Sequence, residues 1–100
     1  MATEEVICNA IRNRYVIQFN YEGQQRIIEP FTLGYHKDTG NLVLSGYRVG
    51  GYTKSHSEPP WRLFKVNQMS GLEVTNQKAA TSRKDYNPND SRMSTIICTY

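Results

Sequence analysis

The residues best suited to binding an anionic ligand fall in strand-like segments near the middle of the chain. Arg62 shares strand parity with Phe64 and Val66, so its guanidinium is expected at the rim of an apolar face, where it could make a bidentate contact to a phosphate. The same arginine could instead be satisfied by Glu29 or by a backbone carbonyl, and both interpretations stay open. Lys65 lies on the opposite parity and either extends a basic patch or is a solvated strand residue.

A second group of candidates lies in the strand expected over residues 42–49. Ser45 and Tyr47 alternate on one face of this strand, Gly46 would allow a ligand to approach the backbone closely, and Arg48 points to the other face. A hydroxyl, an aromatic ring and a guanidinium can together bind a nucleotide by hydrogen bonding, stacking and charge. Tyr47 could equally be a core residue with its hydroxyl at the surface.

Tyr35 and His36 end the preceding strand, next to a turn, and complete the set of candidate ligand-binding residues. A single histidine is often solvated or structural, so His36 also has a plain interpretation. The sequence contains no supported Ser/His/Asp arrangement, no phosphate loop, no HExxH motif and no recognisable pair of catalytic carboxylates. It therefore predicts a binding protein rather than an enzyme, with no metal ion and no cofactor.

The charge of the chain is concentrated in one segment. Twelve lysines and arginines against nine acidic residues give a net charge of +3. Residues 45–84 hold seven basic and two acidic residues, a balance of +5, and the remainder holds five basic and seven acidic residues, a balance of −2. Such an asymmetry is typical of a surface that contacts a nucleic acid backbone, although folding could scatter these charges.

The two cysteines, Cys8 and Cys98, lie near opposite ends of the chain and have no metal-ligand spacing. A disulfide between them is conceivable, but two reduced and mostly buried thiols are the expectation. The first ten residues lack the basic and apolar regions of a signal peptide, and no apolar run approaches the roughly 20 residues of a membrane span. These features predict a cytoplasmic protein without a membrane partner.

The elements that must position the candidate residues are one helix and several short strands. A helix is expected over residues 3–14, with Thr3 as its N-cap and a single apolar stripe. An alternation of apolar and polar residues then begins, and Pro30 marks an edge strand or a bulge. The strands are expected over residues 15–21, 25–35, 42–49, 61–69 and 72–75.

The segment over residues 76–92 is polar and is expected at the surface, and residues 93–100 again have the composition of a strand. One hundred residues suit a single domain over residues 1–100. The predicted fold class is mainly β with an N-terminal helix: a five-stranded small barrel of the SH3-like or Sm-like kind over residues 15–75, to which the C-terminal strand could be added.

The order of motifs resembles the WYL domain, an Sm-like barrel usually found behind a helix-turn-helix in bacterial transcription regulators. The resemblance covers roughly residues 5–75 and rests on four pieces, which are AIRNRYVIQFNY, RIIEPFTL, LVLSGY and WRLFKVNQM. The second resembles the family's Arg-x-x-Glu-Pro-x-x-Leu strand, the third occupies the place of the Trp-Tyr-Leu strand, and the fourth resembles its Arg-x-Phe strand. The naming triplet is here Leu42, Val43 and Leu44, and Asn67 and Gln68 stand where the family has an acidic-basic pair.

The resemblance implies a stand-alone barrel without a helix-turn-helix. Relatives of this kind bind single-stranded nucleic acid, oligonucleotides or nucleotides through basic and polar residues of the barrel and thereby regulate an attached or partner protein. The implied function is a ligand-sensing module in transcription regulation. The alternative is a protein-interaction or homo-oligomerisation module that uses an exposed strand edge, with residues 93–100 as its best candidate.

Overall fold

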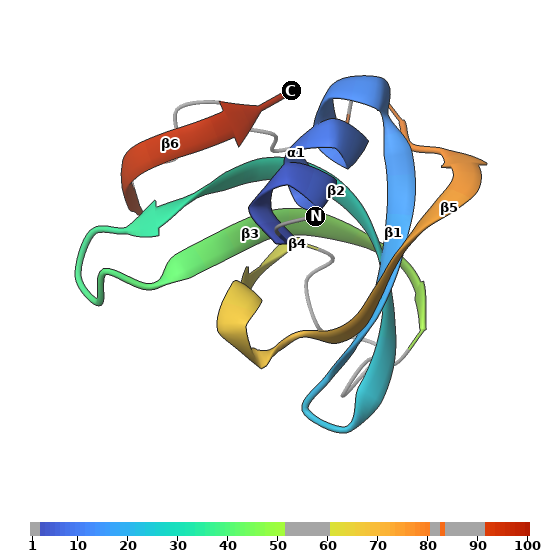
Figure 1. Cartoon of the computed structure of the whole chain (residues 1–100), viewed down its shortest axis with the longest axis horizontal. Helices are drawn as coiled ribbons and strands as arrows, with labels where there is room; N and C mark the ends of the chain where they lie inside the picture. The colour runs from blue at the N-terminus through green and yellow to red at the C-terminus, as the bar shows by residue number, and fades with distance from the viewer. Residues whose placement is uncertain (1–2, 52–60, 81–82, 84–91) are drawn as a thin grey trace.

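A six-stranded antiparallel sheet and one N-terminal helix make up the part of the chain that the computed structural model describes, which is residues 3–51, 61–80, 83 and 92–100 (Figure 1). The elements in chain order are α1 (Thr3–Asn13), β1 (Tyr15–Tyr21), β2 (Gln24–His36), β3 (Leu42–Gly51), β4 (Trp61–Lys65), the 3₁₀ helix η1 (Val66–Gln68), β5 (Ser70–Lys78) and β6 (Met93–Thr99). The predicted fold class, mainly β with an N-terminal helix, is confirmed.

The strand order β4-β3-β2-β1-β5 makes β2 the central strand of the sheet. The first part of β2 pairs with β1 and its last part pairs with β6, while β3 runs along the opposite edge of β2. Because β1 and β6 share one edge of β2, β6 continues the line of β1, and Figure 1 shows it beside the end of β2. The optional C-terminal strand is thus present. The sheet is open in the described residues, and the end strands β4 and β5 are joined through η1.

The hydrophobic core lies between α1 and the curved sheet. The apolar stripe of α1 buries Ile7, Ala10 and Ile11, and α1 packs mainly on β2. Three aromatic rings, Phe19, Tyr21 and Phe64, meet edge to face with centroids 5.1 to 6.2 Å apart. This geometry is favourable for aromatic pairs. The contacts of Phe19 and Tyr21 with Phe64 also connect β1 to β4 across the interior of the barrel.

The turn between β1 and β2 forms as the sequence predicts. Glu22 and Gly23 both have positive φ angles, 54° and 77°, and Tyr21 lies opposite Gln24 in the ladder. Two central residues with positive φ are the mark of a type I′ turn, whose twist matches that of the flanking strands. The turn therefore sets the register of the hairpin.

Pro30 lies at a register shift between Pro30 and Thr32, so the predicted bulge is confirmed. The proline is not on an edge strand, because β2 is central. A second shift lies between Ile27 and Ile28. Because these shifts interrupt the period of two, Ile28, only 1% exposed, lies in the core, whereas Ile27 is partly exposed.

Two strands, β4 and β5, differ from the prediction by more than two residues at one end or the other. The strand expected over residues 61–69 ends at Lys65, and the chain then turns through η1. The strand expected over residues 72–75 instead runs from Ser70 to Lys78, so that the predicted polar segment begins inside a strand. Pairing with β1 explains this extension, because hydrogen bonding to a neighbouring strand holds polar residues that have little strand propensity of their own. Residues 81–82 and 84–91 of the polar segment lie outside the described residues.

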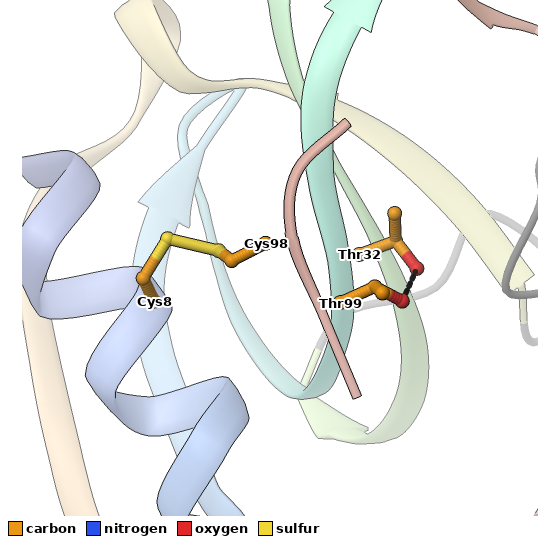
Figure 2. Close-up of a disulfide and its surroundings, with 4 residues drawn as sticks. All are labelled: Cys8, Thr32, Cys98 and Thr99. Carbon is orange, nitrogen blue, oxygen red and sulfur yellow. Dashed lines mark hydrogen bonds between the residues drawn. A yellow bond between two sulfur atoms is a disulfide. The ribbon is translucent and has the colours of Figure 1, made fainter. Parts of the chain in front are cut away.

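The expectation of two reduced cysteines is wrong for this structure. Cys8 of α1 and Cys98 of β6 form a disulfide, with their Cα atoms 5.9 Å apart (Figure 2). The two residues are 90 positions apart, and only the pairing of β6 with β2, beside α1, brings them together. No helix in the described part of the chain is long and apolar enough to cross a membrane.

Candidate functional site

A pocket of about 360 Å³ opens beside the edge strand β4 and brings together three of the seven predicted site residues. Its walls come from the β1–β2 turn, the β2–β3 turn, and β4 with η1. We call it the β4 pocket, and its lining residues are Tyr21, Glu22, His36, Thr39, Val43, Arg62, Leu63, Lys65 and Gln68. The predicted residues among them are Arg62, Lys65 and His36.

Arg62 is held in a fixed orientation at this pocket. Its guanidinium donates a hydrogen bond to Glu22 Oε1 at 2.8 Å, and its central carbon lies 5.4 and 5.2 Å from the ring centroids of Tyr21 and Phe64. The side chain is 26% exposed. The acidic partner that the structure describes is therefore Glu22 and not the Glu29 considered from the sequence. Ion pairing and contact with aromatic rings preorganise the cation while part of it still faces solvent.

Lys65 and His36 contribute the other positive or titratable groups of the pocket. The backbone N–H of Lys65 donates to the Tyr21 hydroxyl oxygen at 3.0 Å, which ties β4 to the end of β1. Its ammonium makes no hydrogen bond or ion pair with the described residues, and the side chain is exposed. His36 Nδ1 accepts a hydrogen bond from the backbone N–H of Asp38 at 3.1 Å, so neutral His36 carries its proton on Nε2. Nε2 is thus available as a donor.

Ser45 and Tyr47 face the other side of the sheet from Arg62. In the β3–β4 ladder Arg62 lies opposite Gly46, while Ser45 and Tyr47 lie opposite Leu63 and Trp61. Cross-strand partners share a face and successive residues alternate, so Arg62 and Tyr47 lie on opposite faces of the sheet. Lys65, which lies opposite Val43, has the parity of Tyr47 and lines the β4 pocket at the edge of the sheet. Ser45 is also only 6% exposed.

The remaining candidates do not line the β4 pocket. Arg48 is half-buried on β3 and, as predicted, has the opposite parity to Tyr47. Tyr35 is 39% exposed and lies between Leu42 of β3 and Thr95 of β6. Tyr47 packs edge to face on Trp61, with centroids 5.4 Å apart. These positions follow from which strands pair and in which register, which period counting along one strand does not include.

The charged group that the sequence analysis undervalued is Glu29. It is 3% exposed and accepts two hydrogen bonds from Arg83, at 2.7 and 2.9 Å, and one from the backbone N–H of Ala80, at 2.9 Å. Burial raises the pKa of this carboxyl, but the hydrogen bonds from Arg83 and Ala80 and the charges of Arg83 and Arg14 outweigh it and lower the pKa. The hydrogen bond with Glu29 likewise raises the pKa of Arg83.

Arg14 completes this group and does not line the β4 pocket. It is buried, with its guanidinium 4.4 Å from the Phe31 ring centroid and 4.3 Å from that of Tyr100. It donates hydrogen bonds to the carbonyl oxygens of Pro30 and Ala80. Arg14 and Glu29 therefore fasten the chain after β5 to β2, which is a structural role. Sequence reasoning missed it because the partners are more than 50 residues from Glu29.

The basic residues of segment 45–84 do not gather on one face. Arg62 and Lys65 line the β4 pocket, whereas the Arg83 guanidinium lies 4.4 Å from the Tyr47 ring centroid and the Lys78 ammonium 4.2 Å from that of Tyr15. Lys54 and Lys84, which also count towards the local charge, lie outside the described residues. Within the described part of the chain, no group of three or more His, Cys, Asp or Glu side chains could hold a metal ion.

Comparison with known proteins gives one assignment. The model of the WYL domain family matches residues 2–74, which includes α1 and the first four strands. Comparisons with the curated proteins and with the solved structures gave no match. The family match spans well over half of the chain and agrees with the helix-first, small-barrel arrangement of the strands. The chain therefore belongs to the WYL domain family, a family of regulatory ligand-sensing modules.

Proposed function

We propose that this WYL domain binds single-stranded nucleic acid, an oligonucleotide or a nucleotide in the β4 pocket, and that binding regulates an attached or partner protein. The observation that carries the proposal is the convergence of Arg62, Lys65 and His36 on one pocket. Arg62 offers a planar guanidinium suited to phosphate, and Lys65 adds a positive charge that no described residue neutralises. Arg62 and Lys65 lie on opposite faces of the edge strand β4 and both line the pocket at that edge, so we expect a phosphate bound there to contact both of them.

The size and position of the pocket support an anionic ligand of nucleotide size. Its 360 Å³ falls at the lower end of the range of about 300 to 1,000 Å³ for small-molecule sites. A longer single strand would place one phosphate or nucleotide in the pocket and extend over the neighbouring surface. Glu22 is the acidic residue of the lining, and its carboxylate already accepts hydrogen bonds from Arg62 and Arg26. Its charge is thereby offset.

Two positions of the family motifs line the pocket with changed residues. Val43 stands in the middle of the naming triplet, and Gln68 stands where the family has a basic residue. Valine offers neither a ring for stacking nor a hydroxyl, and glutamine has no charge. We therefore expect weaker binding than in a WYL domain that has both groups, and Gln68→Arg should increase the affinity for anionic ligands.

Fluorescence polarisation with a labelled single-stranded oligonucleotide tests the proposal, with unlabelled nucleotides as competitors. Lys65→Ala should weaken binding and reduce the slope of log affinity against log salt by about one, as expected for loss of one phosphate contact. Arg12→Ala is the matched control, because Arg12 is an exposed cation on α1 outside the β4 pocket.

The direct variant Arg62→Ala is less informative, because it also removes the ion pair with Glu22 and the contacts with two aromatic rings. Lys65→Ala leaves those contacts in place. Equal weakening by Lys65→Ala and Arg12→Ala would refute the site, because it would show that only total charge matters. Absence of binding by wild type and by Gln68→Arg, at low salt and with all probes, would refute the proposed ligand class.

A second candidate function is association through β6. Within the described residues β6 pairs with β2 along one edge only, and it exposes 36% of Ile97. An unpaired edge can accept another strand. Size-exclusion chromatography with light scattering separates the two functions: a stable oligomer that Ile97→Lys disrupts and that does not bind oligonucleotides would favour association.

A further inference from the structure

The Cys8–Cys98 disulfide lies beside a second pocket. This pocket has a volume of about 330 Å³, and its walls include Cys8, Arg12 and Ile97. Cys8 and Cys98 are 6% and 7% exposed, so the bond is close to the surface but shielded. Cys8 forms part of the pocket wall, whereas Cys98 does not. A small thiol that enters this pocket would therefore approach the disulfide from the Cys8 side.

The disulfide attaches β6 covalently to α1. In β6 only Met93 and Cys98 are buried. Besides the disulfide, β6 has its ladder with β2, contacts with α1, the hydrogen bond between the hydroxyls of Thr32 and Thr99, at 2.9 Å (Figure 2), and one from the Ser94 hydroxyl to the Tyr35 carbonyl oxygen, at 3.4 Å. A strand with few buried side chains that pairs along one edge belongs to the part of a structure that opens most easily.

The two ends of β6 contact different parts of the protein: one end contacts the middle of β2, and the other contacts the turn between β2 and β3. After its C-terminal end, the backbone N–H of Tyr100 donates to the Phe31 carbonyl oxygen at 2.9 Å. At its N-terminal end, Met93 lies opposite His36, and the backbone N–H of Lys37 donates to the Arg92 carbonyl oxygen at 2.8 Å. Because His36 lines the β4 pocket, the start of β6 is attached to the turn that forms one wall of that pocket.

We propose that Cys8–Cys98 is a thiol–disulfide exchange site, at which a dithiol reductant releases β6 from β2 and thereby alters the β4 pocket at His36. The helix does not need the bond for its own packing, because Ile7, Ala10 and Ile11 remain buried against the sheet. Reduction thus frees the strand and leaves the barrel intact. The effect on the pocket rests on the proposed function, whereas the release of β6 does not.

The exchange is balanced in atoms and electrons. A thiolate of the dithiol attacks Cys8 Sγ, the bond between the two protein sulfurs breaks, and Cys98 leaves as a thiolate that takes up a proton. The second thiol of the reductant then displaces Cys8, which also becomes a thiol. The protein gains two electrons and two protons, and the dithiol loses them to become a cyclic disulfide. An oxidising disulfide reverses the reaction.

Hydrogen exchange of the full chain, with and without dithiothreitol, tests the release of β6. We expect the amides of β6, and those N–H groups of residues 32–35 that donate to β6 rather than to β3, to exchange at least about tenfold faster after reduction. Residues 17–21 and 24–28, in the β1–β2 hairpin, should keep their rates and serve as the internal control. Unchanged exchange throughout the chain would overturn the proposal, and so would loss of protection in the hairpin as well, because the bond would then be purely structural.

The point of attack is tested with a monothiol. Glutathione should form a mixed disulfide on Cys8, detected by mass spectrometry of peptides, and a mixed disulfide on Cys98 alone would overturn the proposed route. The double variant C8S/C98S should show the exchange pattern of the reduced protein with or without dithiothreitol. If this variant does not fold, the comparison of oxidised and reduced wild type still decides the question.

Oligonucleotide binding before and after reduction tests the coupling to the pocket. We expect the affinity to change at least about threefold, because the wall that carries His36 loses its anchor at β6. Equal affinity in both states would overturn the coupling. Absence of binding in both states would refute the proposed function and the coupling with it, while hydrogen exchange would still decide whether β6 is released.

Discussion

Replacing Glu29 with glutamine is the sharpest test of how the chain after β5 is fastened to the barrel. Glu29→Gln keeps the shape of the side chain and removes its charge. The carboxylate now accepts two hydrogen bonds from Arg83 and one from Ala80. The amide of glutamine keeps one acceptor oxygen and places an NH₂ group against a guanidinium that can only donate.

The expected loss of stability is about 2 kcal/mol at neutral pH, because hydrogen bonds to charged groups contribute roughly 1.5 to 3 kcal/mol. Two effects oppose each other in this estimate. Glutamine avoids the cost of burying a charge, but the lowered pKa of Glu29 shows that the folded protein favours the ionised form over the neutral one. The Arg83 side chain is 32% exposed, so water can partly replace the lost acceptor, which keeps the loss below that of a fully buried pair.

Urea denaturation followed by fluorescence of Trp61, the single tryptophan, measures this loss. A difference of 2 kcal/mol should lower the midpoint by about 1 M urea. The pKa of Glu29 is lower in the folded state than its ordinary value of 4.5. The stabilisation is therefore complete well above pH 4.5 and is lost as the pH falls through the lower folded-state pKa. Wild type and variant should converge in this acidic range.

The matched control is Glu73→Gln. Glu73 is an exposed residue of β5 that accepts one hydrogen bond from Gln18, at 3.3 Å, so its replacement should change the free energy of unfolding by no more than about 0.5 kcal/mol. If Glu29→Gln were as stable as wild type at neutral pH, the pair with Arg83 would contribute nothing. A loss that stayed constant into the acidic range would show that the charge of Glu29 is not its cause.

Three further substitutions separate backbone, packing and hydrogen-bond effects in the barrel. Gly46→Ala should lower stability by about 2 to 3 kcal/mol in thermal unfolding, because its methyl group would collide with the Cγ2 methyl group of Ile28. Gly23→Ala should lower stability by about 1 kcal/mol in the same assay because of its φ of +77° alone, since nothing lies within 4 Å of the added carbon. If this loss equalled or exceeded that of Gly46→Ala, both the backbone explanation for Gly23 and the packing explanation for Gly46 would be contradicted. Tyr21→Phe leaves the backbone N–H of Lys65 without its acceptor and should cost about 1 kcal/mol in urea denaturation, with faster amide exchange at Lys65 as the specific sign.

Local patterns were sufficient where an element is specified by neighbouring residues. The alternation from Tyr15 to Tyr21 predicts β1, the glycine in the Glu22–Gln24 turn predicts the hairpin, and Pro30 predicts the bulge. The helix prediction is right to within one residue at its end, Asn13. These features depend on φ preferences and on side-chain periodicity, both of which are local properties.

The candidate site was predictable only in part. Arg62, Lys65 and His36 are brought together, but no local pattern indicates that Glu22 pairs with Arg62 from 40 residues away. Ser45 was placed among the ligand-binding residues, although the structure buries it on the other face of the sheet. Residue type identified which groups could bind an anion, and the pairing and register of the strands determined which of them meet.

The sequence by itself determined the small-barrel plan, the helix, the turns and the supply of cations near the Arg-x-Phe strand. Only the tertiary structure decided the partners: Glu22 for Arg62, Arg83 for Glu29, and Cys98 for Cys8. The physical reason is that each of these contacts closes a loop of at least 40 residues, so it forms only after the sheet has set its register. Local preferences carry no information about such pairs, because any acid or thiol of suitable reach could occupy the same place.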